Sequence, residues 1–122
     1  MILVDTSTWV AHLRDGTIGL ETLLNEGKVA CHPFIIGELA CGNLKNRHEI
    51  LSLLETLPTA VQAEHGEVLR LIENRSLMGK GLGYIDMHLL ASAILADFLL
   101  WTFDKKLNEV SSTLGVSYQF SI

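Results

Sequence analysis

The chain has 122 residues, 48% of them hydrophobic, and a formal net charge of −5 at pH 7. This length and apolar content predict a single domain, residues 1–122, with a substantial core and no room for a second domain. The acidic balance argues against charge-driven binding of a polyanion, but that argument weakens if several of the 14 acids form a metal site.

Nothing in the sequence indicates a membrane-spanning segment or a secretion signal. The chain starts on an apolar run with no basic segment before it, so no signal peptide is expected. The longest apolar stretch, 84–103, contains Asp86, His88 and Asp97, which are costly in hydrocarbon. We therefore expect a cytoplasmic protein with no transmembrane segment.

The two cysteines, Cys31 and Cys41, fit a reducing compartment, because a secreted domain of this size would often carry more cysteines, in pairs. We expect both to be buried free thiols. His32 follows Cys31, but no second ligand pair follows at zinc-finger spacing, so we assign no metal role to either cysteine.

The first fifteen residues predict the element around which the chain is organised. Residues 1–4 (Met-Ile-Leu-Val) have too few polar positions to alternate, as expected of a strand covered on both faces of a parallel sheet. Asp5 would then lie at the carboxyl end of a central strand, the edge where open α/β sheets bind ligands. A helix should follow over 6–13, with Thr6 or Ser7 as its N-cap.

Strands and helices alternate over the rest of the chain, which predicts an α/β fold with a mostly parallel sheet. Apolar periodicity and breaker residues place strands at 28–31, 98–102 and 116–120, and helices at 18–24, 33–41, 48–57, 62–78, 84–96 and 107–114. The helix at 84–96 is the most apolar and is expected to be central and buried. The helix at 62–78 should turn four apolar residues inward: Val68, Leu69, Leu71 and Ile72.

Residues 79–83 (Gly-Lys-Gly-Leu-Gly) form a glycine-rich segment that invites comparison with a phosphate-binding loop. The segment lacks the Gly-Lys-Ser/Thr ending of a P-loop and follows a predicted helix instead of a strand. We therefore interpret it as a hinge or a close-approach turn.

Several acids lie next to predicted buried surface. Asp5 follows the first strand, Glu38 lies in an apolar stretch of helix, and Asp86 begins the most apolar helix. An isolated buried carboxylate is very costly, so each needs a partner, and a shared divalent cation would supply one. Asp104 is the fourth candidate, because it follows another predicted strand and so reaches the same edge of the sheet as Asp5.

Asp97 competes with Asp104 for that fourth position. It lies eleven residues after Asp86, which separates the two by about 16 Å along a helix that rises 1.5 Å per residue. Oxygen ligands of Mg²⁺ lie about 2.1 Å from the ion, so Asp86 and Asp97 cannot share one. We therefore predict that Asp97 is a helix-end or turn residue.

Carboxylates without paired histidines favour Mg²⁺, with Mn²⁺ as the alternative, over zinc. Such an ion can bind a phosphate oxygen and lower the pKa of a water molecule. Bases flank the acidic segments, although ordinary solubilising charge is the simpler interpretation of any single one. Four of them are candidate phosphate contacts: Arg14, Lys80, Lys105 and Lys106.

Four segments resemble, in order, the motifs of the PIN-domain family, and most closely those of its VapC toxins from bacterial toxin–antitoxin pairs. They are residues 4–9 (VDTSTW), 37–42 (GELACG), 83–91 (GYIDMHLLA) and 100–107 (LWTFDKKL). One such segment is weak evidence, whereas four in register over nearly the whole chain are specific. The resemblance implies a three-layer α/β/α sandwich with a mostly parallel central sheet, usually found as a homodimer and inhibited by a cognate VapB-type antitoxin.

The resemblance also implies an endoribonuclease in which Mg²⁺ or Mn²⁺ activates water to cleave an RNA phosphodiester, leaving 5′-phosphate and 3′-hydroxyl ends. The four bases named above then become candidate RNA contacts. Thr102 falls on a small hydroxyl position that supports the site, Ser7 matches the polar residue after the first aspartate, and Phe103 occupies a variable position. The acidic positions of the motifs are occupied by Asp5, Glu38, Asp86 and Asp104.

Two other interpretations stay open. A receiver-like or haloacid-dehalogenase-like phosphoacceptor also places an aspartate after its first strand and uses Mg²⁺, but here Ser7 replaces a second acid and Asp86 lies in a helix. It predicts acid-labile phosphate on Asp5. A non-catalytic partner-binding module would use the acids as salt bridges to a basic peptide, and it predicts peptide binding without Mg²⁺ uptake.

Overall fold

A three-stranded parallel sheet lies at the centre of the computed structural model, which describes residues 1–120 apart from the side chain of Ile18. β1 (Ile2–Val4) is the central strand, between β2 (Val29–Ala30) and β3 (Leu99–Trp101). Both neighbours run parallel to β1. The predicted parallel sheet is therefore confirmed, and the residues that follow β1 and β3 emerge at the same edge.

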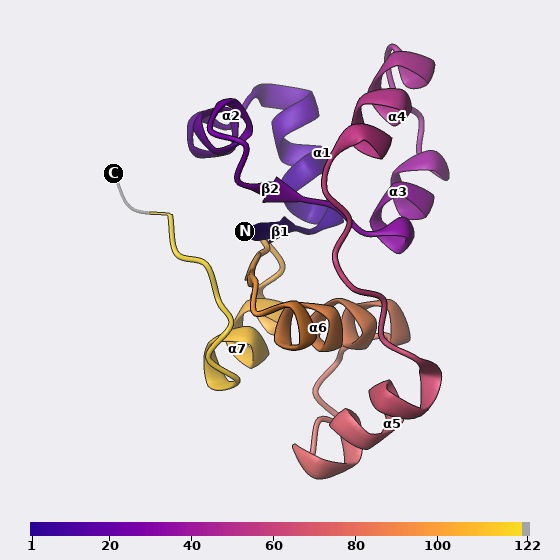
Figure 1. Cartoon of the computed structure of the whole chain (residues 1–122), viewed down its shortest axis with the longest axis vertical. Helices are drawn as coiled ribbons and strands as arrows, with labels where there is room; N and C mark the ends of the chain where they lie inside the picture. Colours follow the sequence, from indigo (N-terminus) through magenta and orange to yellow (C-terminus); the bar gives the residue numbers. More distant parts are fainter. Residues whose placement is uncertain (121–122) are drawn as a thin grey trace.

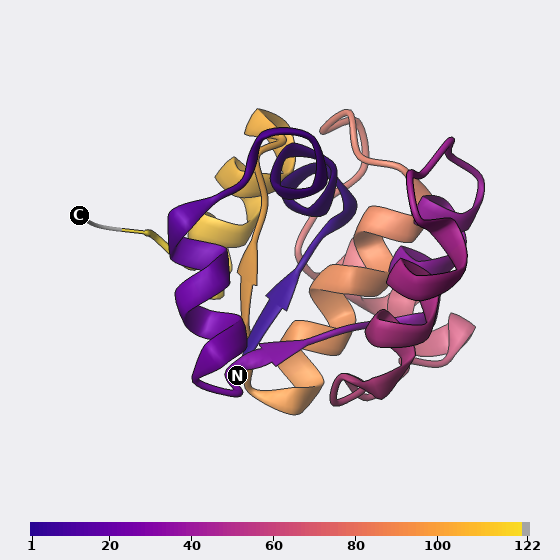
Figure 2. The same ribbon diagram turned by 90° about the horizontal axis from the view of Figure 1, so that it is seen from above.

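Helices cover both faces of this sheet. Figure 1 shows α1 and α2 on one side of the strands and α6 and α7 on the other, and Figure 2 views the strands from the α1 side. The predicted three-layer α/β/α order is confirmed. The helices within residues 1–120 are α1 (Thr6–Asp15), α2 (Ile18–Asn25), α3 (Pro33–Ala40), α4 (Arg47–Thr56), α5 (His65–Asn74), α6 (Tyr84–Ala96) and α7 (Lys105–Thr113).

α6 is the central helix, as predicted. Residues 87–93 are all buried, and Ala91 and Ala93 are among its small residues that let the sheet and α5 approach closely. Burial ends before the helix does, since Ile94 and Leu95 are 39% and 48% exposed. No helix in the described part of the chain is long and apolar enough to cross a bilayer.

The N-cap of α1 is Asp5, so the prediction of Thr6 or Ser7 is wrong. Asp5 has an extended backbone (φ −80°, ψ 174°), and its side chain accepts a hydrogen bond from the Thr8 backbone N–H at 3.2 Å. The strand ends and the helix starts on consecutive residues, which leaves no position for a separate cap. The acid proposed as a metal ligand therefore also begins a helix.

The helix predicted at 62–78 is shorter, because the segment before it is extended and lies along the end of β2. The Cys31 N–H donates to the Pro58 carbonyl, and the Ala60 N–H donates to the Cys31 carbonyl, both at 2.8 Å. These bonds commit the backbone around Ala60 to a sheet-like conformation. α5 consequently starts only at His65.

Two burial predictions are wrong. Leu69 was expected to face inward but is 49% exposed, because α5 packs mainly against α6 and needs only the stripe around buried Val68 for that contact. Cys41 was expected to be buried but is exposed, because it follows the end of α3. Cys31 is buried as predicted, and burial raises the pKa of its thiol to about 11.

The strand predicted at 116–120 is reduced to a single bridge between Ser117 and Leu100 within the described residues. The Leu100 N–H donates to the Val116 carbonyl at 2.6 Å, and the Tyr118 N–H donates to the Leu100 carbonyl at 2.9 Å. Beyond this point the rings of Tyr118 and Phe120 pack against Trp101, at 5.2 and 5.9 Å between centroids. Ring packing thus replaces further ladder hydrogen bonds.

His32 caps α3 through its ring. Its Nδ1 accepts a hydrogen bond from the Phe34 backbone N–H at 3.0 Å, which requires the neutral imidazole with its proton on Nε2. Burial, and then the nearby His88, lower the pKa of His32 from 6.5 to about 4. His32 is only 1% exposed, so protonation would place an uncompensated charge in the core and remove the cap.

We predict that His32 weakens the fold in acid. The unfolded chain binds a proton at His32 below about pH 6.5 whereas the folded chain does not until about pH 4, so this residue should lower the free energy of unfolding by roughly 3 kcal/mol across that range. In His32→Asn, the amide oxygen keeps the cap and cannot titrate. Urea unfolding between pH 4 and pH 7 should show a shallower acid decline for His32→Asn, and the same decline as wild type for exposed His48→Asn. Equal slopes in all three proteins would contradict the assignment.

Candidate active site

Asp5 is the most firmly held acid of the candidate site. It is 5% exposed, and the Ser7 hydroxyl donates to its Oδ1 at 2.7 Å while the Thr102 hydroxyl donates to its Oδ2 at 2.7 Å. The Thr8 N–H adds a bond to Oδ1 at 3.2 Å. Donors from the segments after β1 and β3 thus fix the orientation of one carboxylate.

The same two hydroxyls hold the chain that leads to Asp104. The Ser7 Oγ accepts a hydrogen bond from the Phe103 N–H at 2.9 Å, and the Thr102 Oγ1 accepts one from the Asp104 N–H at 3.0 Å. Ser7 Oγ and Thr102 Oγ1 are themselves 3.2 Å apart. The structure therefore places both predicted supporting residues between Asp5 and the start of α7.

Asp86 and Asp104 lie at helix starts. Asp86 Oδ2 accepts the Gly83 N–H at 3.1 Å in the first turn of α6, and Asp104 Oδ1 accepts the Leu107 N–H at 2.9 Å as the N-cap of α7. Among residues 1–120, the second oxygen of each carboxylate accepts no hydrogen bond. These oxygens are free to bind a further group.

Glu38 is an exposed residue of α3 that reaches across to α1. Its Oε1 accepts a hydrogen bond from the Thr6 hydroxyl at 2.6 Å, while its Oε2 has no such donor in the described part of the chain. Thr6 follows Asp5 directly, so this bond brings Glu38 to the same edge of the sheet. All four predicted acids are thus gathered from four separate elements.

The four acids affect one another electrostatically. Burial is the largest cause of the raised pKa of Asp5, and the negative charge of Asp86 adds to it. The pKa of Asp86 is also raised, first by burial and then by the charges of Asp104 and Glu38. The hydrogen bonds to Asp5 and Asp86 act in the opposite direction because they favour the charged forms.

No base of the described chain neutralises this cluster. Ion pairs in that part join Arg14 to Asp15 and Lys28 to Glu26, and neither pair includes one of the four acids. Folding therefore brings together carboxylates whose negative charges no ion pair in the described chain offsets, a costly arrangement for the buried Asp5 and the partly buried Asp86 unless a cation binds to them.

The donor set fits a hard divalent cation, because every candidate ligand atom is a carboxylate oxygen. As the side chains lie, no group of three or more His, Cys, Asp or Glu residues within 1–120 is close enough to hold an ion. Thr6 holds Glu38, and the capping bonds hold Asp86 and Asp104 on their own helices. Binding an ion would therefore require rotation of these side chains. Such rotation is possible because only one oxygen of each carboxylate is held by a hydrogen bond.

A row of aromatic rings lies between α3 and α6. The sequence alone indicated no role for these rings. Phe34 packs edge-on against His88 at 4.9 Å between ring centroids, and His88 packs edge-on against Tyr84 at 4.5 Å. These contacts fix α3 relative to α6, and so Glu38 relative to Asp86. The nearest signal in the sequence is the position of His88, two residues after Asp86 in the most apolar helix.

The candidate RNA contacts differ in their surroundings. Arg14 is paired with Asp15 at 2.8 Å, whereas the exposed Lys80, Lys105 and Lys106 have no carboxylate partner in the described chain. Lys106 lies directly over Gly81, where an added Cβ would stand 2.8 Å from its Cδ and 2.9 Å from its Nζ. Gly81 also has a positive φ of 80°. Of the two predicted alternatives, a hinge and a close-approach turn, the glycine-rich segment is therefore the close-approach turn.

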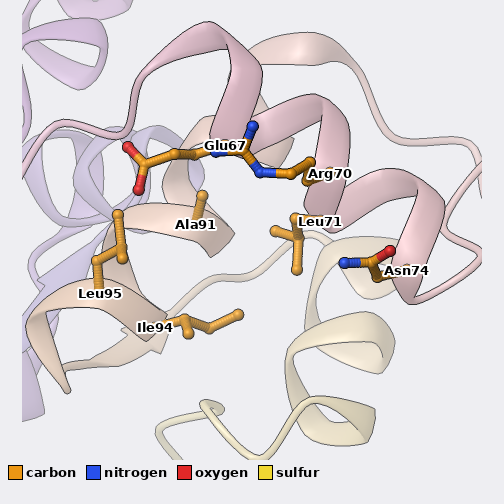
Figure 3. Close-up of a pocket in the computed structure, with 7 residues that line it drawn as sticks. All are labelled: Glu67, Arg70, Leu71, Asn74, Ala91, Ile94 and Leu95. Atoms are coloured by element: carbon orange, nitrogen blue, oxygen red, sulfur yellow. The ribbon is translucent and has the colours of Figure 1, made fainter.

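The other end of α6 is distant from the acids. Asp97 follows the last residue of α6 with a left-handed backbone (φ 57°), in agreement with its prediction as a helix-end residue. A cavity lies at this end, between α5 and α6, and Figure 3 shows the residues that line it. Its volume is about 250 Å³. Its wall includes Leu71 and Ile94 but none of the four acids, so it is not the candidate site.

Comparisons with known proteins agree with this description. A family model described as the PIN domain matches residues 2–112, a span that includes all four acids. The chain is also 45% identical over 118 residues to Ribonuclease VapC32 of Mycobacterium tuberculosis, from the CDC 1551 / Oshkosh strain and equally from the ATCC 25618 / H37Rv strain. Each alignment covers 96% of this chain and 95% of the relative. The chain belongs to the PIN-domain family.

Proposed function

We propose that this chain is an endoribonuclease of the VapC toxin type that cleaves an RNA phosphodiester with Mg²⁺, or with Mn²⁺ in its place. The observation that carries the proposal is the cluster of four carboxylates at one edge of the sheet without an ion-pair partner in the described chain. Family membership and the name "ribonuclease" of relatives at 45% identity support it.

Each acid has a distinct role in this proposal. Asp5 and Asp86 hold the ion, and Asp104 contributes to a second or weaker ion site. Glu38, an exposed residue whose Oε2 accepts no hydrogen bond in the described chain, acts as a ligand or orients the attacking water. When bound, the ion lowers the pKa of a water molecule and offsets negative charge on the phosphate.

Ser7 and Thr102 are positioning residues. Their hydroxyls donate to both oxygens of Asp5 and therefore hold its carboxylate in one orientation and favour its charged form. Cleavage by the activated water leaves 5′-phosphate and 3′-hydroxyl ends.

A VapB-type antitoxin and a second copy of the chain are the protein partners that we expect. An apolar groove of about 310 Å³ between α1, α2 and α4 supports the first expectation, because an amphipathic helix of a partner could insert its apolar face there. The groove is lined by residues that include Trp9, Leu13, Leu24 and Leu53, the last of them 56% exposed.

We predict that Asp5→Asn lowers the rate of RNA cleavage by about 100-fold or more, because it removes a charged ligand of the ion. Ser7→Ala and Thr102→Val should lower the rate by about 10- to 100-fold, because each removes a hydroxyl that holds the Asp5 carboxylate in place. Rates are measured on total RNA with Mg²⁺ and with EDTA. Asp97→Asn, a carboxylate outside the cluster, should cleave normally. Full activity in EDTA, or in Asp5→Asn, would refute the proposal.

We predict that Asp86→Asn stabilises the metal-free protein. The raised pKa of Asp86 means that its charge destabilises the fold at neutral pH, and the amide removes the charge yet can still accept the Gly83 N–H. Thermal unfolding in EDTA should show a rise of about 2–5 °C. Added Mg²⁺ should raise the melting temperature of the wild type more than that of the variant, because binding stabilises only a folded site. A fall of several degrees in EDTA would identify Asp86 as a structural residue.

We predict that Lys106→Ala weakens RNA binding similarly for all sequences. Its ammonium has no carboxylate partner in the described chain, and Gly81 allows it to lie close to the start of α6. Loss of one phosphate contact should reduce the magnitude of the slope of log affinity against log salt concentration by about 0.7–1. Lys28→Ala removes a lysine paired with Glu26 and should leave the slope unchanged. Identical slopes for wild type and Lys106→Ala would exclude the contact.

A further inference from the structure

Another hollow lies next to Asp5 and Asp104, because Thr102, which is hydrogen-bonded to Asp5, and Phe103, which precedes Asp104, line it. It has a volume of about 300 Å³ and is formed by the end of β3, by α7, by the segment after α7 and by Thr17 between α1 and α2. Aromatic rings and side-chain amides dominate its wall: Trp101, Phe103, Tyr118, Phe120, Asn108 and Gln119.

The wall of this cavity and the first acid form one hydrogen-bonded unit. Thr102 lines the cavity, and its hydroxyl donates to Asp5 Oδ2 at 2.7 Å. The backbone N–H of Phe103 donates to Ser7 Oγ at 2.9 Å, and the Ser7 hydroxyl donates to Asp5 Oδ1 at 2.7 Å. Asp104 is the next residue along the chain. A group bound in the cavity would therefore lie close to Asp5 and Asp104.

Two phenylalanines of the wall are about half exposed, although the rings of both contact the buried Trp101. Phe103 is 52% exposed and Phe120 is 44% exposed, and their ring centroids lie 6.0 and 5.9 Å from that of Trp101. Phe120 is seated against Gly19 of α2, where an added Cβ would stand 2.6 Å from its ring. The exposed rings are thus held in place instead of moving freely, which makes them suitable stacking surfaces.

The polar part of the wall offers both a donor and an acceptor. The Ser117 hydroxyl donates to Asn108 Oδ1 at 2.8 Å, and Gln119 Nε2 donates to Ser117 Oγ at 2.6 Å. These bonds fix the two amides and leave the amino group of Asn108 and the carbonyl oxygen of Gln119 for a ligand. Paired donors and acceptors of this kind recognise the edges of nucleobases.

We propose that this cavity receives one unstacked base of the RNA substrate, stacked on Phe103 and Phe120 and contacted at its polar edge by Asn108 and Gln119. The inference rests on the proposed ribonuclease function and adds to it a site for the base beside the phosphate that is cleaved. Single-stranded RNA is the fitting ligand, because proteins recognise its splayed bases by aromatic stacking together with hydrogen bonds to their edges.

The test compares RNA with and without bases. Short fluorescein-labelled oligoadenylate, oligouridylate and an abasic ribose-phosphate strand of equal length are titrated with the full chain in EDTA, and binding is followed by anisotropy. The wild type should bind at least one base-bearing strand about tenfold more tightly than the abasic strand. Phe103→Ala should lose this preference while its affinity for the abasic strand stays the same, because its phosphate contacts are intact.

Matched variants separate stacking from other effects. Phe103→Trp should retain the preference, since it keeps an aromatic face, and Leu69→Ala, which removes an equally exposed apolar side chain on α5, should bind as wild type does. Asn108→Ala should change the ratio of affinities for the adenine- and uracil-bearing strands. Thermal unfolding of Phe103→Ala should match wild type, because the ring is exposed.

Equal binding of base-bearing and abasic strands by the wild type, or an unchanged preference in Phe103→Ala, would overturn the base site. Those results would leave the ribonuclease proposal standing if Mg²⁺-dependent cleavage is still observed. In contrast, absence of cleavage together with a base preference that depends on Phe103 would refute the nuclease and support the base site. The two proposals therefore fail separately.

Discussion

The hydrogen bonds to a buried carboxylate, that of Asp5, are the interaction on which the rest of the site depends. Without the hydroxyls of Ser7 and Thr102, the charged form of this acid would be isolated at the end of the central strand, a position that proteins rarely tolerate. The same hydroxyls accept the backbone N–H groups of Phe103 and Asp104. One polar network thus joins the ends of β1 and β3, starts α1 and directs the chain into α7.

This network stabilises the charged form of Asp5, but it does not remove the repulsion among the four carboxylates. The charges of Asp104 and Glu38 contribute to the raised pKa of Asp86. Contacts outside the cluster hold together the helices that carry Glu38 and Asp86. The rings of Phe34, His88 and Tyr84 supply that constraint between α3 and α6. Packing energy from the core therefore offsets an electrostatic cost at the site, as expected where function requires like charges to be close together.

Strand-end reasoning was sufficient to place Asp5 and Asp104 at one edge, because parallel strands put their carboxyl ends together. The positions of Glu38 and Asp86 depended more on the resemblance to known motifs. Features that arise from distant parts of the chain were not predictable. Leu69 faces solvent because of which helix α5 packs against, and the strand expected at 116–120 gives way to ring packing on Trp101. The cavity beside Phe103 likewise exists only once four separate segments have met.

Three of the four acids also begin helices: Asp5 caps α1, Asp104 caps α7, and Asp86 lies in the first turn of α6. Each helix carries roughly half a positive charge at this end. The peptide dipoles of three helices therefore favour the charged forms of these aspartates, whether or not the protein cleaves RNA. A descendant that had lost its activity would still keep the capping hydrogen bonds that Asp5 and Asp104 accept. Glu38 lies within α3 and caps nothing, so loss of the acid at this position, with the aspartates retained, would distinguish an inactive relative from an active one.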